Sequence, residues 1–139
     1  MRTFGYELVV DCDKCDLEAV QSLDNIKKFV DDVLVKTEMK KMSDMYSCYL
    51  EDTPENREKG IVGWSICQFI QTSSLTMHLC ENLERGYGTV YLNFFSCKEF
   101  DKDDVIELLK VYFGARIRNV NCLRRDATSS DFIFRSQCQ

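Results

Sequence analysis

Two amphipathic stretches, separated by a long series of strand-like segments, constrain the fold of this chain more than any other feature. In the first, apolar residues recur at helical spacing from Leu23 to about Lys36, and Ser22 precedes them as a capping residue. The second follows Asp101, a further capping residue, and is expected to end at Gly114. Each helix has one apolar stripe to bury, so both must pack on a sheet formed by the other segments.

The other segments have the β-branched, aromatic or alternating character of strands. We predict strands at residues 6–11, 42–50, 61–71, 75–79, 89–97 and 117–123, with a short seventh at 131–135. The charged segment 52–60, which holds the only proline, is predicted to be a loop. The order β-α-β-β-β-β-α-β predicts an α+β fold, a two-layer α/β sandwich with a mostly antiparallel sheet and two helices on one face. With 139 residues, we expect a single domain spanning 1–139.

The net charge of −5 argues against nucleic acid or an anionic membrane as a partner, because phosphate binding needs a basic face. No apolar run approaches the ~20 residues that span a bilayer. The first ten residues also lack the apolar core of a signal peptide. We therefore expect a cytoplasmic protein whose eight cysteines are reduced thiols.

One pair of cysteines, Cys12 and Cys15, has the CxxC spacing of a zinc ligand pair. A structural zinc ion needs four ligands, usually supplied by two such pairs. The chain has no second CxxC, and His78 is its only histidine. The pattern therefore favours packing over metal binding, and we expect no metal.

A short polar segment, Thr72-Ser73-Ser74, interrupts two apolar runs and favours a tight turn. His78 follows five residues after Ser73, and Cys97 ends the next predicted strand. Each of these features is ordinary when taken alone. A serine is common in turns, a single histidine after an apolar run is usually a satisfied residue, and a cysteine at the end of a strand usually packs.

Taken in order, these segments resemble the bacterial and archaeal S-adenosylmethionine decarboxylases over roughly residues 4–126. In that family a glycine-bearing strand, here 60–63, leads into Glu-Ser-His-Leu-Ser-Ile-His, which matches residues 72–78. A later Tyr-Gly strand that ends in a cysteine matches residues 87–97. Cys15-Asp16 and Gly114-Ala115-Arg116 also fit the family pattern.

The resemblance implies roles for several residues. The serine that matches Ser73 is cleaved in the family to a pyruvoyl group, which forms a Schiff base with the substrate amine and acts as an electron sink. The histidine that matches His78 assists this processing, and the cysteine that matches Cys97 serves as an acid. Of the family's Trp-Pro-Glu, only the carboxylate remains here, as Glu81.

The departures from the family surround the expected site. The glutamate before the reactive serine is Thr72 here, and the histidine after it is Ser74. About four residues are inserted near 82–85. The strand at 42–50 lacks the family's histidine and offers Tyr46 and Tyr49 instead. These changes put the cofactor chemistry in doubt more than the fold.

Three hypotheses follow. The one we favour is a lyase that breaks the carbon–sulfur bond of S-adenosylmethionine, or of its AMP conjugate SAM-AMP, without a pyruvoyl cofactor. The substrate's own carboxylate can attack its γ-carbon, so the protein need only fold the substrate and hold the cation. The second is an active decarboxylase with a pyruvoyl group from Ser73. The third is a non-catalytic paralogue or ligand sensor.

The candidate residues divide into two groups. We expect catalytic roles for Ser73, His78, Cys97 and Glu81. We expect substrate contacts from Thr72, Ser74, Tyr46, Tyr49 and Phe94. The resemblance also implies a homodimer or homotrimer with sites between subunits. If the ligand carries a phosphate, the arginines that could meet it are Arg116, Arg118 and Arg124.

Overall fold

The computed structural model describes residues 3–127, which form one six-stranded sheet and four helices. The strands are β1 (Thr3–Asp16), β2 (Tyr46–Leu50), β3 (Gly63–Ile70), β4 (Ser73–Asn82), β5 (Tyr87–Ser96) and β6 (Arg116–Asp126). The helices are α1 (Leu17–Gln21), α2 (Leu23–Lys36), α3 (Pro54–Lys59) and α4 (Lys102–Phe113).

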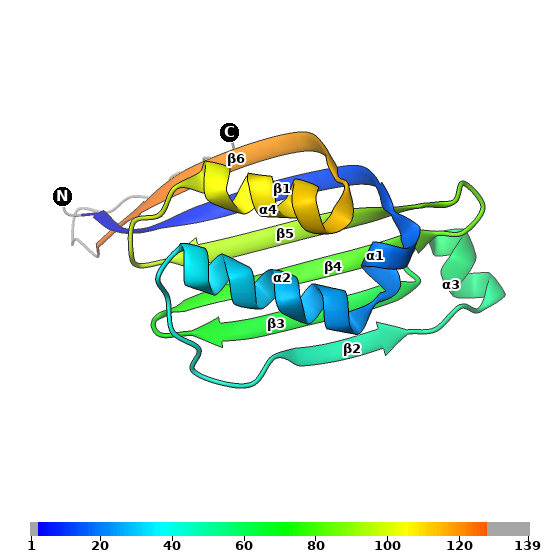
Figure 1. Cartoon of the computed structure of the whole chain (residues 1–139), viewed down its shortest axis with the longest axis horizontal. Coiled ribbons are helices and arrows are strands. Elements are labelled where there is room, and N and C mark those ends of the chain that lie inside the picture. The colour runs from blue at the N-terminus through cyan, green and yellow to red at the C-terminus, as the bar shows by residue number, and fades with distance from the viewer. Residues whose placement is uncertain (1–2, 128–139) are drawn as a thin grey trace.

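The sheet has the strand order β2-β3-β4-β5-β1-β6, and each neighbouring pair is antiparallel. Helices α1, α2 and α4 lie together on one face of the sheet (Figure 1). The predicted α+β two-layer sandwich, with a mostly antiparallel sheet, is therefore confirmed. That residues 1–139 make a single domain stays a prediction, because the described part of the chain is shorter.

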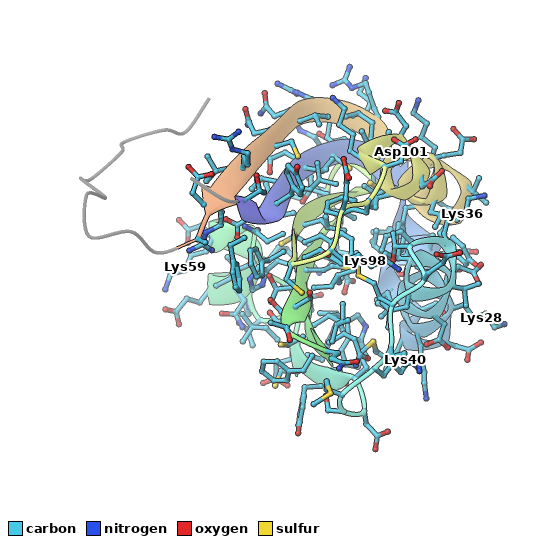
Figure 2. All side chains as sticks on the ribbon, turned by 90° about the vertical axis from the view of Figure 1, so that its left-hand side faces the viewer. Lys28, Lys36, Lys40, Lys59, Lys98 and Asp101 are labelled. Carbon is cyan, nitrogen blue, oxygen red and sulfur yellow. The ribbon has the colours of Figure 1, made fainter. Side chains whose placement is uncertain are left out.

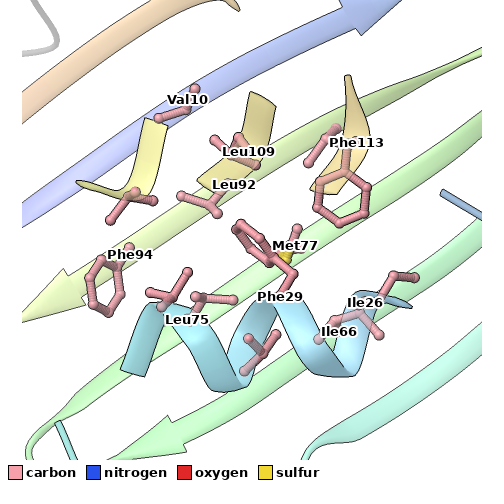
Figure 3. Close-up of a cluster of buried hydrophobic side chains, with 14 of the residues drawn as sticks. Val10, Ile26, Phe29, Ile66, Leu75, Met77, Leu92, Phe94, Leu109 and Phe113 are labelled. Carbon is pink, nitrogen blue, oxygen red and sulfur yellow. The ribbon is translucent and has the colours of Figure 1, made fainter. Parts of the chain in front are cut away.

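The core fills the space between the helices and the sheet. Figure 3 shows Phe29 of α2 and Phe113 of α4 pointing toward the strands, and their ring centroids lie 5.1 Å apart. Leu75 and Met77 of β4 and Leu92 of β5 meet them from the sheet, and none of the three has exposed surface. Burying side chains of this size stabilises the fold by about 1.5–3 kcal/mol each.

The two long helices begin and end where the sequence predicts. The Ser22 hydroxyl accepts a hydrogen bond from the backbone N–H of Asn25, which caps α2. Asp101 caps α4 through the N–H of Asp103. Gly114 ends α4 in the left-handed conformation that favours glycine.

Several predicted elements differ in the structure. Helix α1 joins the two predicted helices on the sheet, and β4 spans Ser73–Asn82 rather than residues 75–79. Residues 54–59 are a helix, not a loop, because Thr53 caps Asn56 and proline suits a first helical position. Strand β1 runs on to Asp16 through a bulge between Cys12 and Cys15. Strand β2 starts at Tyr46 rather than at residue 42. The predicted strand at 131–135 lies outside the described residues.

The face of the sheet opposite these three helices is called the open face here. Along β4, Leu75, Met77 and Leu79 are buried toward the helices, so the alternate residues Ser74, Thr76 and His78 lie on the open face. Residues that pair across neighbouring strands lie on the same face of the sheet. Ser65 of β3 and Tyr91 of β5, for example, pair directly with His78.

Two buried thiols in β1 should make the fold less stable at alkaline pH. Burial raises the pKa of Cys12 to about 12 from an ordinary value of 9.0, and it does the same for Cys15. The unfolded chain ionises these thiols first as the pH rises, so their contribution is complete below pH 9 and is lost between about pH 9 and 12. We expect the unfolding midpoint in urea to fall over this range. The fall should be smaller in the Cys12→Ala, Cys15→Ala double variant, and an equal slope would contradict this cause.

Candidate active site

Three cavities open near the residues that the sequence singles out. The Ser73 cavity, of about 290 Å³, is lined by Glu38, Met39, Lys40, Ile70, Gln71, Thr72, Ser73, Cys97 and Lys98. The His78 cavity, of about 270 Å³, is lined by Leu50, Ile61, Gly63, Trp64, Ser65, His78, Leu79, Cys80 and Tyr91. The Arg57 cavity, of about 340 Å³, is lined by Arg57, Glu58, Gly60, Cys80, Glu81, Asn82, Leu83, Glu84, Thr89 and Tyr91.

The Ser73 cavity brings two predicted catalytic residues together. Ser73 begins β4 and Cys97 follows β5, and the backbone N–H of Cys97 donates to the Ser73 Oγ over 3.2 Å. The Ser73 hydroxyl in turn lies 3.9 Å from the Cys97 Sγ. Lys98 closes one side of the cavity, where its Nζ donates to the Glu38 carbonyl over 3.1 Å.

Two non-glycine residues with positive φ line the Ser73 cavity, and a third, Lys14, lies in β1. Thr72 and Glu38 both have φ of +57°, a left-handed conformation that residues with a Cβ seldom adopt. The two segments are held together, since the N–H of Gln71 donates to the Lys40 carbonyl over 3.1 Å. Strained residues of this kind gather at functional sites, and here one of them immediately precedes Ser73.

His78 lies in a different cavity, on the open face. Its Nδ1 is 3.0 Å from the Ser65 Oγ, which fixes the imidazole at the mouth of the His78 cavity. Tyr91, which pairs with His78, supplies aromatic surface to the same cavity. His78 is five residues from Ser73, which is about 17 Å along a strand and an odd spacing that changes the face of the sheet. Ser73 and His78 therefore do not share a site within one chain.

The Arg57 cavity adjoins the His78 cavity, because Cys80 and Tyr91 line both. Its wall includes the carboxylates of Glu58 and Glu84 together with the Arg57 guanidinium. The two cavities thus combine aromatic surface, one imidazole, one guanidinium and the carboxylates of Glu58 and Glu84. Glu81 also lines the Arg57 cavity, but its carboxylate is bonded to Tyr49 and Gln21.

Glu81 is separated from His78 by the sheet. It is three residues from His78, so it lies on the helix-covered side, where its side chain is 6% exposed. The Tyr49 hydroxyl donates to Glu81 Oε2 over 2.7 Å, and the Gln21 Nε2 donates to Oε1 over 2.8 Å. Burial and then this hydrogen bond raise the pKa of Tyr49 to about 12, so it stays a donor. Trp64 completes the cluster by donating to the Gln21 carbonyl.

This placement predicts a stability role for Glu81. In Glu81→Gln the charge-assisted bonds to Tyr49 and Gln21 are weakened, and we expect the free energy of unfolding to fall by about 1–3 kcal/mol. Turnover per folded molecule should change little. Urea unfolding and a turnover assay on the same preparation measure both quantities. If the variant kept its stability but lost turnover, Glu81 would have a catalytic role.

The remaining predicted contacts are dispersed. Ser74 lies on the open face, and Tyr46 packs its ring edge against Phe69, with centroids 6.1 Å apart. Phe94 has no exposed surface and packs on Phe100, with centroids 4.8 Å apart. The prediction that Phe94 contacts substrate is therefore wrong, because its ring belongs to the core.

Three arginines proposed for a phosphate lie far from these cavities, on β6 at the opposite edge of the sheet from β2. Arg116 and Arg118 both bind Asp13, with Arg116 donating through Nε and Nη2 over 2.7 Å each. Arg124 pairs with Asp126 at 3.1 Å.

Sequence reasoning missed three residues of the adjoining cavities: Ser65, Tyr91 and Arg57. Ser65 and Tyr91 pair with His78 across strands β3, β4 and β5. The sequence alone did not reveal this strand register. Arg57 stood in a segment predicted to be a loop. Over residues 3–127, no three His, Cys, Asp or Glu side chains are grouped to hold a metal ion. In the same range, no helix has the length and apolarity to cross a membrane.

The fold of this chain matches that of a solved structure. The crystal structure of the adenosylmethionine decarboxylase from Aquifex aeolicus VF5 matches with a TM-score of 0.68 and 12% identity, over 96% of this chain and 100% of that chain. At this identity, the match shows the fold alone. The sequence profile of S-adenosylmethionine decarboxylase matches residues 6–126. The chain therefore belongs to the S-adenosylmethionine decarboxylase family. A search of curated proteins gives no match.

Proposed function

We propose that this protein is a lyase that cleaves the carbon–sulfur bond of S-adenosylmethionine or of its adenylated derivative SAM-AMP. The substrate carboxylate attacks the γ-carbon, a carbon–oxygen bond forms, and the carbon–sulfur bond breaks. Its electron pair goes to the sulfur, which loses its positive charge. The products are methylthioadenosine, or its AMP conjugate, and homoserine lactone, and no pyruvoyl group is needed.

The observation that carries this proposal is the environment of His78. The His78 cavity joins an imidazole oriented by Ser65 to the aromatic ring of Tyr91, and it does so without Ser73. An aromatic face attracts a sulfonium ion, as it does other cations. The imidazole can hold the substrate carboxylate in line with the γ-carbon, which is positioning catalysis. Family membership supports S-adenosylmethionine as the ligand class.

The decarboxylase alternative has its own support at the other end of β4. Ser73 keeps hydrogen-bonded contact with Cys97, and the strained residue Thr72 stands directly before it. A pyruvoyl group formed from Ser73 would accept the electrons of the bond to carbon dioxide. This alternative requires cleavage of the chain before Ser73.

Product analysis separates the hypotheses. The mass of the intact purified protein is measured by mass spectrometry. The protein is then incubated with S-adenosylmethionine and, separately, with its AMP conjugate. We expect an uncleaved chain that releases methylthioadenosine, or its conjugate, with homoserine lactone. Carbon dioxide together with two fragments that meet before Ser73 would establish the decarboxylase. Binding of either compound without any product would establish a ligand sensor.

We also propose a cytoplasmic homo-oligomer, dimer or trimer, that joins subunits through the part of the open face that lies away from the His78 cavity. Large apolar side chains remain exposed there: Phe4, Tyr46, Phe69 and Leu123. Burying them in a second subunit would gain about 25 cal/mol per Å² of apolar surface. Light scattering at micromolar concentration should give two or three chain masses. A monomer would contradict this.

A further inference from the structure

Helix α3 is a self-contained unit attached to the sheet only through its ends. Within residues 3–127, no other helix or strand packs closely against it, and none of its residues is buried. Its hydrogen bonds and ion pairs are local. Asn56 donates to the Glu51 carbonyl, and Lys59 pairs with Glu55 at 2.9 Å. An element that gains so little from tertiary packing opens at small free-energy cost.

The position of α3 is that of a cover for the ligand cavities. Figure 1 places it at one end of the sheet, and Figure 2 shows Lys59 of α3 across the sheet from Lys28 and Lys36 of α2. Leu50 and Ile61 flank it, are each more than two-fifths exposed, and line the His78 cavity. Movement of α3 toward the open face would cover this apolar surface, which is favourable.

The inner side of α3 carries the cation of the Arg57 cavity. The Arg57 guanidinium binds Asp52, with Nε donating to Oδ1 over 2.9 Å, in a pair that is half-exposed. Exposed ion pairs of this kind contribute little to stability, so Arg57 can exchange Asp52 for another anion. Glu58 and Glu84 stand in the same wall. One guanidinium that shares a cavity wall with carboxylates complements a ligand that has an anionic group close to cationic ones.

We propose that α3 is a lid over the ligand cavity and that Arg57 is its anion-binding residue, which leaves Asp52 for an oxyanion of the ligand as the lid closes. The inference rests on the proposed function, because the ligand is taken to be S-adenosylmethionine or its adenylated form. The oxyanion is the amino-acid carboxylate in the first compound. In the second it is either that carboxylate or the phosphate.

Binding measurements test Arg57 without requiring turnover. The probe is sinefungin, which keeps the amino-acid carboxylate but has no sulfonium to cleave, and isothermal titration calorimetry measures its binding. Arg57→Gln should raise the dissociation constant at least tenfold, because a charge-assisted contact is lost. Lys59→Gln is the matched control, since it removes the same charge from the same helix outside the cavity lining, and it should leave the constant unchanged.

Two further probes identify the oxyanion. Methylthioadenosine has neither carboxylate nor phosphate, so Arg57→Gln should not change its affinity. AMP carries only the phosphate. A loss of affinity in Arg57→Gln for sinefungin alone assigns the carboxylate, and a loss for AMP alone assigns the phosphate. Equal affinities of wild type and Arg57→Gln for both probes would overturn the inference.

Limited proteolysis tests closure of the lid. Trypsin should cut after Arg57 and Lys59 in the unliganded protein, and sinefungin should slow both cuts at least fivefold. Lys40, beside the Ser73 cavity, is the reference site and should be cut at an unchanged rate. Protection at Lys40 instead would place the ligand in the Ser73 cavity and overturn the inference. Wild-type protein that binds none of the three probes would overturn the proposed function as well, whereas binding without lid protection overturns only the lid.

Discussion

In His78→Ala, turnover of S-adenosylmethionine or its adenylated form should fall about 100-fold or more while the fold is retained. The reason is that loss of positioning at the reacting atoms costs about this factor. The side chain is exposed on the open face, and its one hydrogen bond within the described residues is to Ser65, so its removal leaves little buried surface unsatisfied. Release of methylthioadenosine, followed by liquid chromatography, measures the effect.

Thr76→Ala is the matched control for His78→Ala. Thr76 lies two residues away on the same strand and the same face, but it does not line the His78 cavity. It should keep wild-type turnover. The turnover of Ser65→Ala should lie between those of the two variants, because this change only removes the hydrogen bond that orients the imidazole. Equal activity of His78→Ala and Thr76→Ala would show that the chemistry takes place elsewhere.

Gly63→Ala should prevent the chain from folding stably. A Cβ at this position would lie 1.9 Å from the Leu79 carbonyl oxygen, and the φ of +141° is one that L side chains rarely adopt. Strands β3 and β4 would have to part at the wall of the His78 cavity. We expect a loss of more than about 4 kcal/mol, which is exceptional for a point mutation. Thermal unfolding followed by circular dichroism measures it.

Gly60→Ala separates backbone strain from steric conflict. Gly60 also has positive φ, +68°, but a Cβ there would meet nothing within 4 Å. It should cost only about 1–2 kcal/mol, the strain of the left-handed conformation. If Gly63→Ala were as stable as Gly60→Ala, the pairing of Gly63 with Cys80 would be wrong.

Local signals made much of the fold predictable. Ser22, Asp101 and Gly114 act on neighbouring backbone groups, so their effect can be inferred without tertiary structure. The same kind of signal was present at Thr53 and Pro54, but the charged composition of the segment favoured a loop. Helix α3 was therefore missed, and with it the role of Arg57.

The candidate site depends on strand parity and on distant contacts. Strand β4 runs to Asn82, so Glu81 and His78 lie on opposite faces of the sheet. The predicted strand ended at residue 79, and this consequence was therefore missed. The Ser73 cavity is built from three segments, 38–40, 70–73 and 97–98, whose meeting no local pattern reveals. Family resemblance supplied the residue types, whereas the geometry divided them between two ends of β4.

The most direct test of carbon–sulfur cleavage without a pyruvoyl group is turnover by the Ser73→Ala variant. Alanine cannot form a pyruvoyl group, and Ser73 lies outside the His78 cavity. The variant and the wild type are each incubated with S-adenosylmethionine and with its AMP conjugate, and the products are quantified by mass spectrometry. We predict release of methylthioadenosine, or its conjugate, with homoserine lactone at the wild-type rate. Loss of all turnover in Ser73→Ala, with carbon dioxide as the wild-type product, would contradict the account.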